Sequence, residues 1–250
     1  MCKKNILIIG ATGGIGADIS REMSMAGENL ILVSRKKEKL VDLCESLDSD
    51  AMVFPCDIRD YHQVAGLFDY LKNEGIVLDA MVYCAGMCYI KPVRSMGAGE
   101  LEEMFKTNLY GFYEACRLFQ VRGASRKGSS IVALSSYAAI AKEIGMSAYA
   151  MTKTAMNVAV EVLSKEFLKK QIRINAILPA ETTSKMGQYS SGLSVAEMEY
   201  IRSYQPLGPV NVEEISKLTR YLVSESSAHI TGALIELSGG FKGKANAREV

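Results

Sequence analysis

The sequence predicts an α/β fold in which helices cover both faces of one parallel sheet. Short apolar runs rich in β-branched residues, typical of strands buried on both faces, alternate with stretches of helical periodicity. Alternation at this spacing is typical of a doubly wound sheet with right-handed crossovers. The chain has no Pro/Ser-rich linker, internal repeat or low-complexity tract, so its 250 residues are expected to form one domain.

The expected elements can be placed in order along the chain. Residues 5–9 form the first buried strand, which stops at Gly10, and helical periodicity follows from about Gly14 to Met25. A second apolar run at 30–33 predicts the next strand. The remaining strand candidates, with helical stretches between them, are residues 51–55, 78–84, 130–135, 172–178 and 233–237.

The segment 147–170 is expected to form one long helix, since it contains neither Gly nor Pro after a candidate N-cap at Ser147. A helix that is apolar on more than one side is buried on more than one side. One side can pack on the sheet and the other against a second subunit, so we expect an oligomer. One stripe holds Met151, Ala155, Val158 and Val162, and another side carries Met156, Val160 and Leu163.

Composition narrows the classes of function. The formal net charge is +1, so no global field recruits nucleic acid or an anionic membrane. Six cysteines without a Cys-x-x-Cys pair and only two histidines argue against a metal site and for reduced thiols in a cytoplasmic protein. The apolar run before Gly10 is too short for a signal peptide or a membrane span.

The turn after the first strand carries the pattern Gly10-x-x-x-Gly14-x-Gly16. Glycine at such a turn permits positive φ and lets the backbone approach a pyrophosphate closely. The helix that follows points N–H groups and the positive end of its dipole at that anion. The spacing differs from the common Gly-x-Gly-x-x-Gly loop but lies in the same strand-turn-helix context. We expect a dinucleotide to contact Gly10, Thr12, Gly13, Gly14, Ile15 and Gly16.

The end of the second strand bears on the choice of dinucleotide. An NAD site usually places an acidic residue here to hold the ribose 2′-hydroxyl, whereas an arginine can hold a 2′-phosphate. No acidic residue is present, and Ser34 and Arg35 are the candidates for contact with a 2′-phosphate. NADP(H) is therefore expected in preference to NAD(H). Lys36 and Lys37 are expected only to lie in solvent at the start of the next helix.

A tyrosine and a lysine four residues apart lie near the start of the long helix. Residues at i and i+4 share a helix face, so Tyr149 and Lys153 can point at the same spot. Hydride transfer to a carbonyl leaves an alkoxide that needs a proton, and a nearby ammonium should lower the pKa of the tyrosine that supplies it. Ser136 follows the strand at 130–135, at the edge where open α/β sheets bind ligands, and its hydroxyl could hold the substrate oxygen.

Together these motifs resemble those of the short-chain dehydrogenase/reductase family, in its single-domain branch, and the likeness covers nearly the whole chain. The resemblance implies a three-layer, doubly wound Rossmann fold with a seven-stranded, mainly parallel sheet. It also implies that Asn108 completes a catalytic tetrad with Ser136, Tyr149 and Lys153. Further cofactor contacts are implied for Asp57, Ile58, Cys84, Ala85, Gly86, Tyr149, Lys153, Pro179 and Thr182.

The chain departs from the family pattern in a few places. Tyr83 and Cys84 replace two asparagines, of which the first usually stabilises the central sheet and the second lies beside the cofactor. Ala180 replaces the glycine of a Pro-Gly turn, and Gly13 offers no basic side chain to a 2′-phosphate. None of these changes touches the tetrad.

The substrate pocket is expected between the segments that follow Gly86, Ser136 and Pro179. Residues from about 180 to 210 would form its substrate-binding insertion within a single domain over 1–250. An apolar lining with a few hydroxyl groups suits a ketone on a hydrophobic or mixed body. The candidate lining residues are Met87, Cys88, Tyr89, Ile90, Tyr137, Ala138, Ala139, Ile140, Met186 and Tyr189.

The likeness is greatest to 3-oxoacyl-[acyl-carrier-protein] reductases, whose basic residues beside the site mouth hold the acidic carrier. Lys127 and Lys170, with Arg126 and Lys169 next to them, fall at comparable positions. We therefore expect an NADPH-dependent carbonyl reductase, a homodimer or homotetramer, acting on a small ketone or on a thioester held by an acyl carrier. The alternatives are an NAD-dependent alcohol or sugar dehydrogenase of the same family and a non-catalytic, cofactor-sensing regulator.

Overall fold

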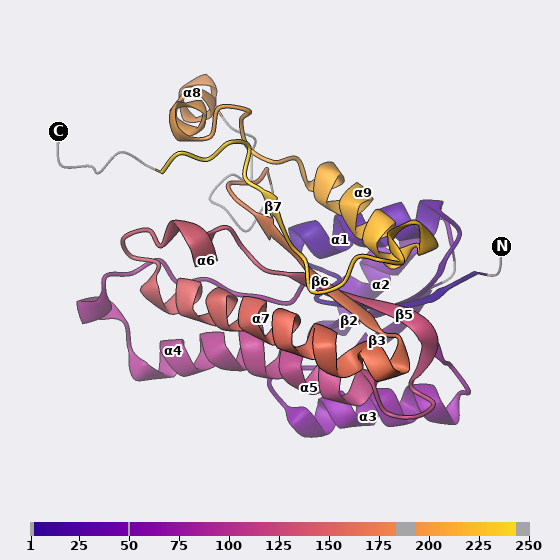
Figure 1. Ribbon diagram of the computed structural model, residues 1–250. Coiled ribbons are helices and arrows are strands. Elements are labelled where there is room, and N and C mark those ends of the chain that lie inside the picture. The colour runs from indigo at the N-terminus through magenta and orange to yellow at the C-terminus, as the bar shows by residue number, and fades with distance from the viewer. Residues whose placement is uncertain (1–2, 50, 184–193, 244–250) are drawn as a thin grey trace.

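A seven-stranded sheet forms the middle layer of the computed structural model, which describes residues 3–49, 51–183 and 194–243 (Figure 1). The strands follow the order β3-β2-β1-β4-β5-β6-β7, and every neighbouring pair is parallel. The expected doubly wound fold is therefore confirmed, with a sheet that is parallel throughout. The strands are β1 (Asn5–Ile9), β2 (Asn29–Ser34), β3 (Ala51–Pro55), β4 (Leu78–Tyr83), β5 (Ser125–Leu134), β6 (Arg173–Pro179) and β7 (Leu234–Leu237).

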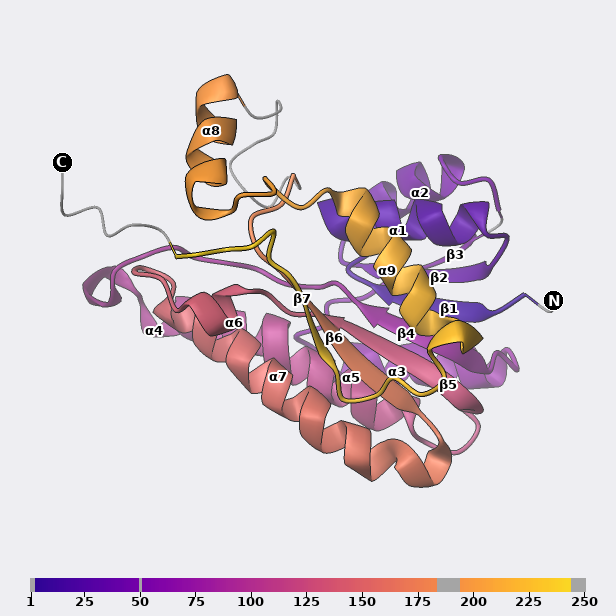
Figure 2. The same ribbon diagram turned by 45° about the horizontal axis from the view of Figure 1, so that its top comes forward.

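Helices cover both faces of this sheet. They are α1 (Gly14–Met25), α2 (Lys37–Glu45), α3 (Tyr61–Asn73), α4 (Ala98–Phe105), α5 (Gly111–Phe119), α6 (Ala138–Ala141), α7 (Ser147–Glu166), α8 (Val195–Tyr204) and α9 (Val212–Val223). A π-helical turn, η2 (Lys106–Tyr110), joins α4 to α5. α3, α4, α5 and α7 lie on one face, and α1, α2 and α9 lie on the other (Figure 1). α8 stands apart from both layers when the molecule is turned (Figure 2).

The inner positions of the central strands are largely apolar because their alternate residues face different helical layers. In β1, Leu7 and Ile9 pack in a core cluster with residues of α3, α5 and α7. Ile6 and Ile8 pack in a second cluster with residues of α1, α2 and α9. Each strand therefore contributes to two cores, which fixes its register and the position of the turn at its end.

Several expected strand ends differ by one residue from those observed, and two further boundaries are also wrong. Met146 rather than Ser147 is the N-cap residue of α7, and no side chain caps that helix. The backbone makes the turn instead, through bonds from Met146 N to Glu143 O and from Ala150 N to Met146 O. β5 begins at Ser125 rather than at residue 130, because its first residues are polar and give no apolar signal. With the 3-10 turn η3 (Phe167–Lys170), α7 covers the expected helix at 147–170.

The strand order reverses where β1 lies beside β4, and open α/β sheets bind ligands at such a switch point. Gly10 follows β1, and the segment from Cys84 to Gly86 follows β4. The two turns touch, since a Cβ atom added at Gly10 would stand 2.5 Å from the backbone nitrogen of Ala85. The fold thereby brings the glycine loop and the segment after β4 together.

Three expectations from composition can be compared with the described residues. Within these ranges no helix is long and apolar enough to cross a membrane. No group of three or more His, Cys, Asp or Glu residues in the same ranges is arranged to hold a metal ion. The five cysteines that the structure describes are free thiols.

Candidate active site

Two adjoining pockets share Gly13, Cys84 and Gly86 as a common wall. We call the one that contains Tyr149 the catalytic pocket and the other the nucleotide pocket; their volumes are about 220 and 450 Å³. The catalytic pocket is also lined by Gly14, Ile15, Gly16, Ser136, Lys153, Pro179 and Thr182. The nucleotide pocket is also lined by Gly10, Thr12, Ser34, Arg35, Asp57, Ile58 and Ala85.

The glycine loop leaves no room for side chains at two positions. Gly10 has φ +87°, and the clash with Ala85 described above would accompany any substitution there. A Cβ atom at Gly16 would stand 2.3 Å from the Gly10 carbonyl oxygen. Gly13 is the N-cap of α1 and gives that helix no side-chain cap, so the first N–H groups can serve an anion. The loop therefore has the form of a pyrophosphate cradle.

Cations gather at the far wall of the nucleotide pocket. Arg35, Lys36 and Lys39 line it beside Ser34, whose buried Oγ has no hydrogen-bond partner within the part of the chain that the structure describes. A buried hydroxyl normally has a partner, so this one is suited to a ligand oxygen. Three cations and a free hydroxyl together fit a phosphate group. Lys36 and Lys37 are both exposed, as expected, but Lys36 also lines this pocket, whereas Lys37 does not.

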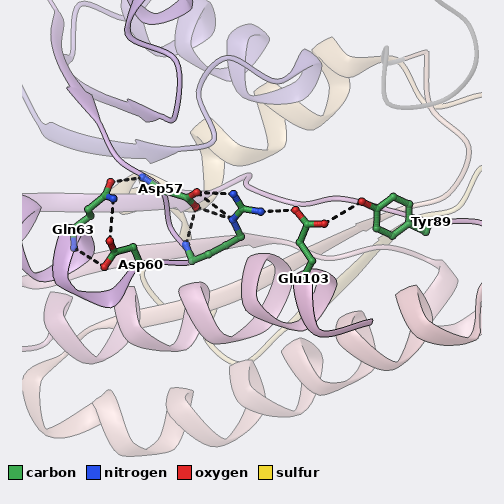
Figure 3. Close-up of polar contacts among 6 residues, drawn as sticks. Asp57, Asp60, Gln63, Tyr89 and Glu103 are labelled. Atoms are coloured by element: carbon green, nitrogen blue, oxygen red, sulfur yellow. Dashed lines mark hydrogen bonds and ion pairs between the residues drawn. The ribbon is translucent and has the colours of Figure 1, made fainter. Parts of the chain in front are cut away.

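A row of charged and polar side chains, linked by hydrogen bonds and ion pairs (Figure 3), includes Asp57, Arg59, Glu103 and Tyr89, which also line the nucleotide pocket. Asp57 Oδ1 accepts hydrogen bonds from the backbone N and Nε of Arg59, at 3.0 and 2.9 Å. Arg59 also forms an ion pair with Glu103, which accepts a hydrogen bond of 3.1 Å from the Tyr89 hydroxyl. These bonds to Arg59 hold the pKa of Asp57 below its usual value, so the carboxylate stays charged. Arg59, which was not predicted, thus binds the carboxylate that the family resemblance implies as a cofactor contact.

The catalytic pocket brings Ser136, Tyr149 and Lys153 together from two elements. Ser136 lies two residues beyond the end of β5, while Tyr149 and Lys153 lie on one face of α7. The Lys153 ammonium is buried and donates a hydrogen bond of 2.7 Å to the Leu134 carbonyl oxygen. It lies 5.8 Å from the centre of the Tyr149 ring. The strand end and the helix are therefore fixed to each other at the reacting groups.

The acid–base properties of this pair differ from the expectation. Burial raises the pKa of Tyr149 well above its usual value, although a hydrogen bond with Ser136 acts in the opposite direction. Burial also lowers the pKa of Lys153 to about 8, with Cys84 and Cys88 acting against that shift. The expected lowering of the tyrosine pKa is therefore wrong for this structure, because desolvation outweighs the hydrogen bond with Ser136. Tyr149 therefore holds its proton at neutral pH.

Asn108 lies behind the catalytic pocket rather than in its wall. It sits in η2 and is fully buried. Its Oδ1 accepts a hydrogen bond of 2.8 Å from the Met87 backbone N, and its Nδ2 donates one of 2.9 Å to the Met87 carbonyl. Nδ2 also donates a hydrogen bond of 3.0 Å to Oγ1 of Thr152, which lies next to Lys153. Asn108 thus ties the segment after β4 to the catalytic helix.

Two thiols stand close to the tetrad. Cys84 and Cys88 both line the catalytic pocket. Burial raises the pKa of Cys84 to about 12 and that of Cys88 to about 11, while Lys153 acts in the opposite direction on both. Since the thiolate is the reactive form, neither residue is an activated nucleophile at neutral pH. Their sulfur atoms form a neutral, polarisable part of the wall of the catalytic pocket.

The substrate end of the catalytic pocket is mixed in character. Of the expected lining residues, Cys88, Ile90, Tyr137 and Ala138 are present in its wall, whereas Met186 and Tyr189 lie outside the described residues. Glu143 and Phe241 also line this pocket and were not among the expected lining residues. Phe241 reaches the site from beyond β7 and packs against the ring of Tyr137 at 5.1 Å.

The basic residues expected at the site mouth lie elsewhere in the chain. Lys127 stands near the start of β5, whose far end leads to Ser136, and Lys170 follows the end of α7 opposite to Tyr149 (Figure 1). A strand rises roughly 3.3 Å per residue, so about 30 Å separates Lys127 from Ser136 along β5. Lys170 Nζ donates to the Gln120 carbonyl at 2.6 Å, and Arg126 pairs with Asp79 at 3.0 Å. Within one chain these cations cannot serve the site.

Comparison with known proteins agrees with this arrangement. A family model described as enoyl-(acyl carrier protein) reductase matches residues 10–242. The 2,3-dihydro-2,3-dihydroxybenzoate dehydrogenase of Bacillus subtilis is 28% identical over 249 residues, covering 95% of each chain. A short-chain type dehydrogenase/reductase from Mycobacterium ulcerans has a TM-score of 0.86 at 23% identity, covering 97% of this chain and 92% of that one. A 3-oxoacyl-[acyl-carrier protein] reductase from Brucella melitensis has a TM-score of 0.84 at 23% identity, covering 95% and 91%.

Proposed function

The chain belongs to the short-chain dehydrogenase/reductase family, oxidoreductases that act on CH–OH and C=O groups, and from this premise we propose that it is an NADPH-dependent carbonyl reductase. The observation that carries the proposal is the continuity of the two pockets. One bears Ser136, Tyr149 and Lys153, and the other ends in a cluster of cations. A nicotinamide dinucleotide with a 2′-phosphate would place its nicotinamide ring in the catalytic pocket and its phosphate beside the cations of the nucleotide pocket.

Tyr149 is the proton donor in this proposal. Its raised pKa keeps the hydroxyl protonated at neutral pH, as an acid for reduction requires. Bound NADPH supplies the hydride that reduces the carbonyl carbon. The Tyr149 hydroxyl gives its proton to the substrate oxygen, which becomes the alcohol, while Ser136 holds that oxygen. Positive charge on Lys153 stabilises the phenolate that Tyr149 becomes.

The cation cluster supports NADPH rather than NADH. Arg35 and the buried hydroxyl of Ser34 offer charge-assisted and neutral hydrogen bonds to a 2′-phosphate, and Lys36 and Lys39 add positive charge. An NAD site would instead call for an acidic residue at the end of β2, and the sequence from Ser34 to Lys37 contains none.

Parallel fluorescence titrations with NADPH and NADH test this proposal, followed by turnover of a panel of aliphatic and aromatic ketones and β-ketoacyl thioesters. We expect tighter binding of NADPH and turnover of at least one ketone. Tyr149→Phe should abolish turnover and leave NADPH affinity within a few-fold. Tyr137→Phe removes a hydroxyl from the same pocket and should retain most of the activity. Turnover retained by Tyr149→Phe would refute the mechanism.

An alcohol or sugar dehydrogenase of the same family is the second candidate. The similarity to a dihydrodiol dehydrogenase favours it, and so do Glu143 and Glu181 in the catalytic pocket, which could accept hydrogen bonds from substrate hydroxyl groups. A preference for NADH, with oxidation of alcohols or sugars, would select this function. All four tetrad residues are present, so we do not propose a non-catalytic regulator.

We also propose that the chain is a homodimer or homotetramer. A largely apolar groove between α5 and α7 is lined by Tyr110 and Tyr113 on one side and by Val158 and Val162 on the other. These four side chains are exposed in the single chain. α5 and α7 lie side by side on the outer face of the molecule (Figure 1). Pairing of two such faces would remove this apolar surface from water.

A small ketone is the substrate class that we favour over a thioester on an acyl carrier. Carrier binding would need cations near the catalytic pocket, and the expected ones lie at the far edge of the chain. The five cysteines within the described residues are free thiols, and they support a reducing, cytoplasmic setting for this enzyme.

A further inference from the structure

Tyr83, the last residue of β4, stands where relatives carry the first asparagine of a pair, and its side chain has a specific partner. The residue is fully buried, and its ring packs edge-on against Phe112, with centroids 5.3 Å apart and planes at 65°. Its hydroxyl donates a hydrogen bond of 2.5 Å to the Thr107 carbonyl oxygen. Gly111 permits this approach, since a Cβ atom there would stand 2.9 Å from the hydroxyl.

The Thr107 carbonyl needs such a donor because it lies in the π-helical turn η2. In an α-helix, the N–H of Gly111 would bond to Thr107, four residues earlier. Here it bonds to the Lys106 carbonyl, five residues earlier. In the π-turn the Thr107 carbonyl therefore lacks the N–H donor that it would have in an α-helix. A carbonyl left without a hydrogen bond in a protein interior costs stability. The Tyr83 hydroxyl replaces the missing donor.

This turn also carries Asn108. From η2 the Asn108 amide makes two hydrogen bonds with Met87 and one with Thr152, as described above. Thr152 in turn donates a hydrogen bond of 2.8 Å to the Tyr149 carbonyl oxygen. A continuous set of contacts thus runs from Tyr83 through Thr107 and Asn108 to the segment that holds the catalytic tyrosine and lysine.

We propose that Tyr83 is a positioning residue for the reduction: its hydroxyl holds η2 in the π form that aims Asn108 at Met87 and at the catalytic helix. The hydroxyl touches neither substrate nor the reacting atoms, and it acts only through Thr107 and Asn108. The effect on turnover rests on the proposed reductase function, whereas the structural part of the proposal does not.

Hydrogen exchange of Tyr83→Phe tests the structural part without any need for turnover. The variant keeps the ring and loses only the hydroxyl. We expect exchange to become about tenfold faster in residues 106–112 and at Met87, whose N–H bonds to Asn108, with no change in β1 or β6. Phe119→Leu is the matched control. Phe119 lies on α5, the helix that follows η2, and belongs to the same core cluster as Tyr83, but it bonds to neither Thr107 nor Asn108. Exchange in Tyr83→Phe equal to that of the wild type would overturn the proposal.

Kinetics test the positioning part. Tyr83→Phe should lower kcat for ketone reduction about tenfold, leave NADPH affinity within twofold, and move the pH at which kcat falls. Phe119→Leu should lower Tm and leave both kcat and the pH profile within twofold. If Tyr83→Phe exchanged faster but kept the kcat and pH profile of the wild type, Tyr83 would have only a structural role, and the positioning proposal would be overturned. Faster exchange in a protein whose wild type reduces no ketone would refute the reductase function and leave the Tyr83 contact established.

Discussion

The Lys153 ammonium donates its hydrogen bond to the Leu134 carbonyl oxygen, 2.7 Å away, while it lies 5.8 Å from the centre of the Tyr149 ring. The side chain is only 3% exposed, so its charge is held in a poorly solvated position. This placement lowers the pKa of Lys153 to about 8 by burial. The folded chain therefore releases the Lys153 proton at a lower pH than the unfolded chain does.

We expect Lys153 to make stability depend on pH in the alkaline range. The folded state releases the Lys153 proton near pH 8 and the unfolded state near 10.5, so the unfolded state binds more protons between these values. Stability conferred by this residue must then rise with pH across that window, by about 3 kcal/mol in total. Urea unfolding of the wild type and Lys153→Met should show the wild type gaining that amount relative to the variant between pH 8 and 10.5.

Lys165→Met controls for the loss of a lysine side chain from the same helix, because Lys165 is exposed. A difference between the wild type and Lys153→Met that stays constant from pH 8 to 10.5 would show that the Lys153 ammonium is not buried as described.

The cation cluster should decide between cofactors. Arg35→Ala is expected to raise the dissociation constant for NADPH by roughly tenfold or more, because a charge-assisted hydrogen bond to a phosphate is lost. The constant for NADH should change by less than about twofold. Lys37→Ala removes the neighbouring cation that does not line the pocket and should alter neither. Isothermal titration of both cofactors measures these values, and equal losses in Arg35→Ala would count against a 2′-phosphate contact.

Gly10 should be the least replaceable residue of the glycine loop. Gly10→Ala combines a φ of +87° with a Cβ atom 2.5 Å from Ala85 N, and we expect a loss of about 3 kcal/mol or more in unfolding free energy. Gly27→Ala is the matched variant, since Gly27 has φ +77° but nothing within 4 Å. It should lose only about 1 kcal/mol, from the backbone conformation alone. Chemical denaturation separates the two, and equal losses would show that Ala85 can move aside.

The groove between α5 and α7 should hold the subunits together. Val158 is 53% exposed in the single chain, and Val158→Glu would place a charge in the proposed interface. We expect light scattering to give a smaller assembly for this variant than for the wild type. Val93→Glu, at a position that is 81% exposed and outside the groove, should keep the wild-type mass. A monomeric wild type would refute the oligomer itself.

Much of this arrangement is predictable from the sequence, because the strands are buried on both faces and their ends are marked. Gly10, Ser136 and Pro179 each follow an apolar run, so their presence at one edge of the sheet follows from a parallel order. The helix face shared by Tyr149 and Lys153 follows from their spacing alone.

Other features depend on contacts that sequence spacing does not contain. A lowered pKa for Tyr149 was predicted from a neighbouring charge, but burial in the folded pocket raises that pKa instead. Lys39, Glu143 and Phe241 reach the pockets only through the way the chain folds back on them. Lys127 occupies the expected position in the sequence, yet the length of β5 carries it to the opposite edge. The hydrogen bond from Tyr83 to Thr107 depends on a π-turn, and no pattern in the sequence predicted that turn.

The contact between the turns after β1 and β4 has a consequence for how the chain unfolds. The nucleotide pocket is lined by residues at the ends of β1 and β2 and by residues that follow β3 and β4, which are four neighbouring strands of the sheet. A ligand bound there contacts the segments after all four strands only while the strands are paired, so its binding energy opposes their separation. Saturating cofactor should therefore hold this part of the sheet together to a higher temperature. The cofactor would then stabilise the sheet as well as take part in the reaction.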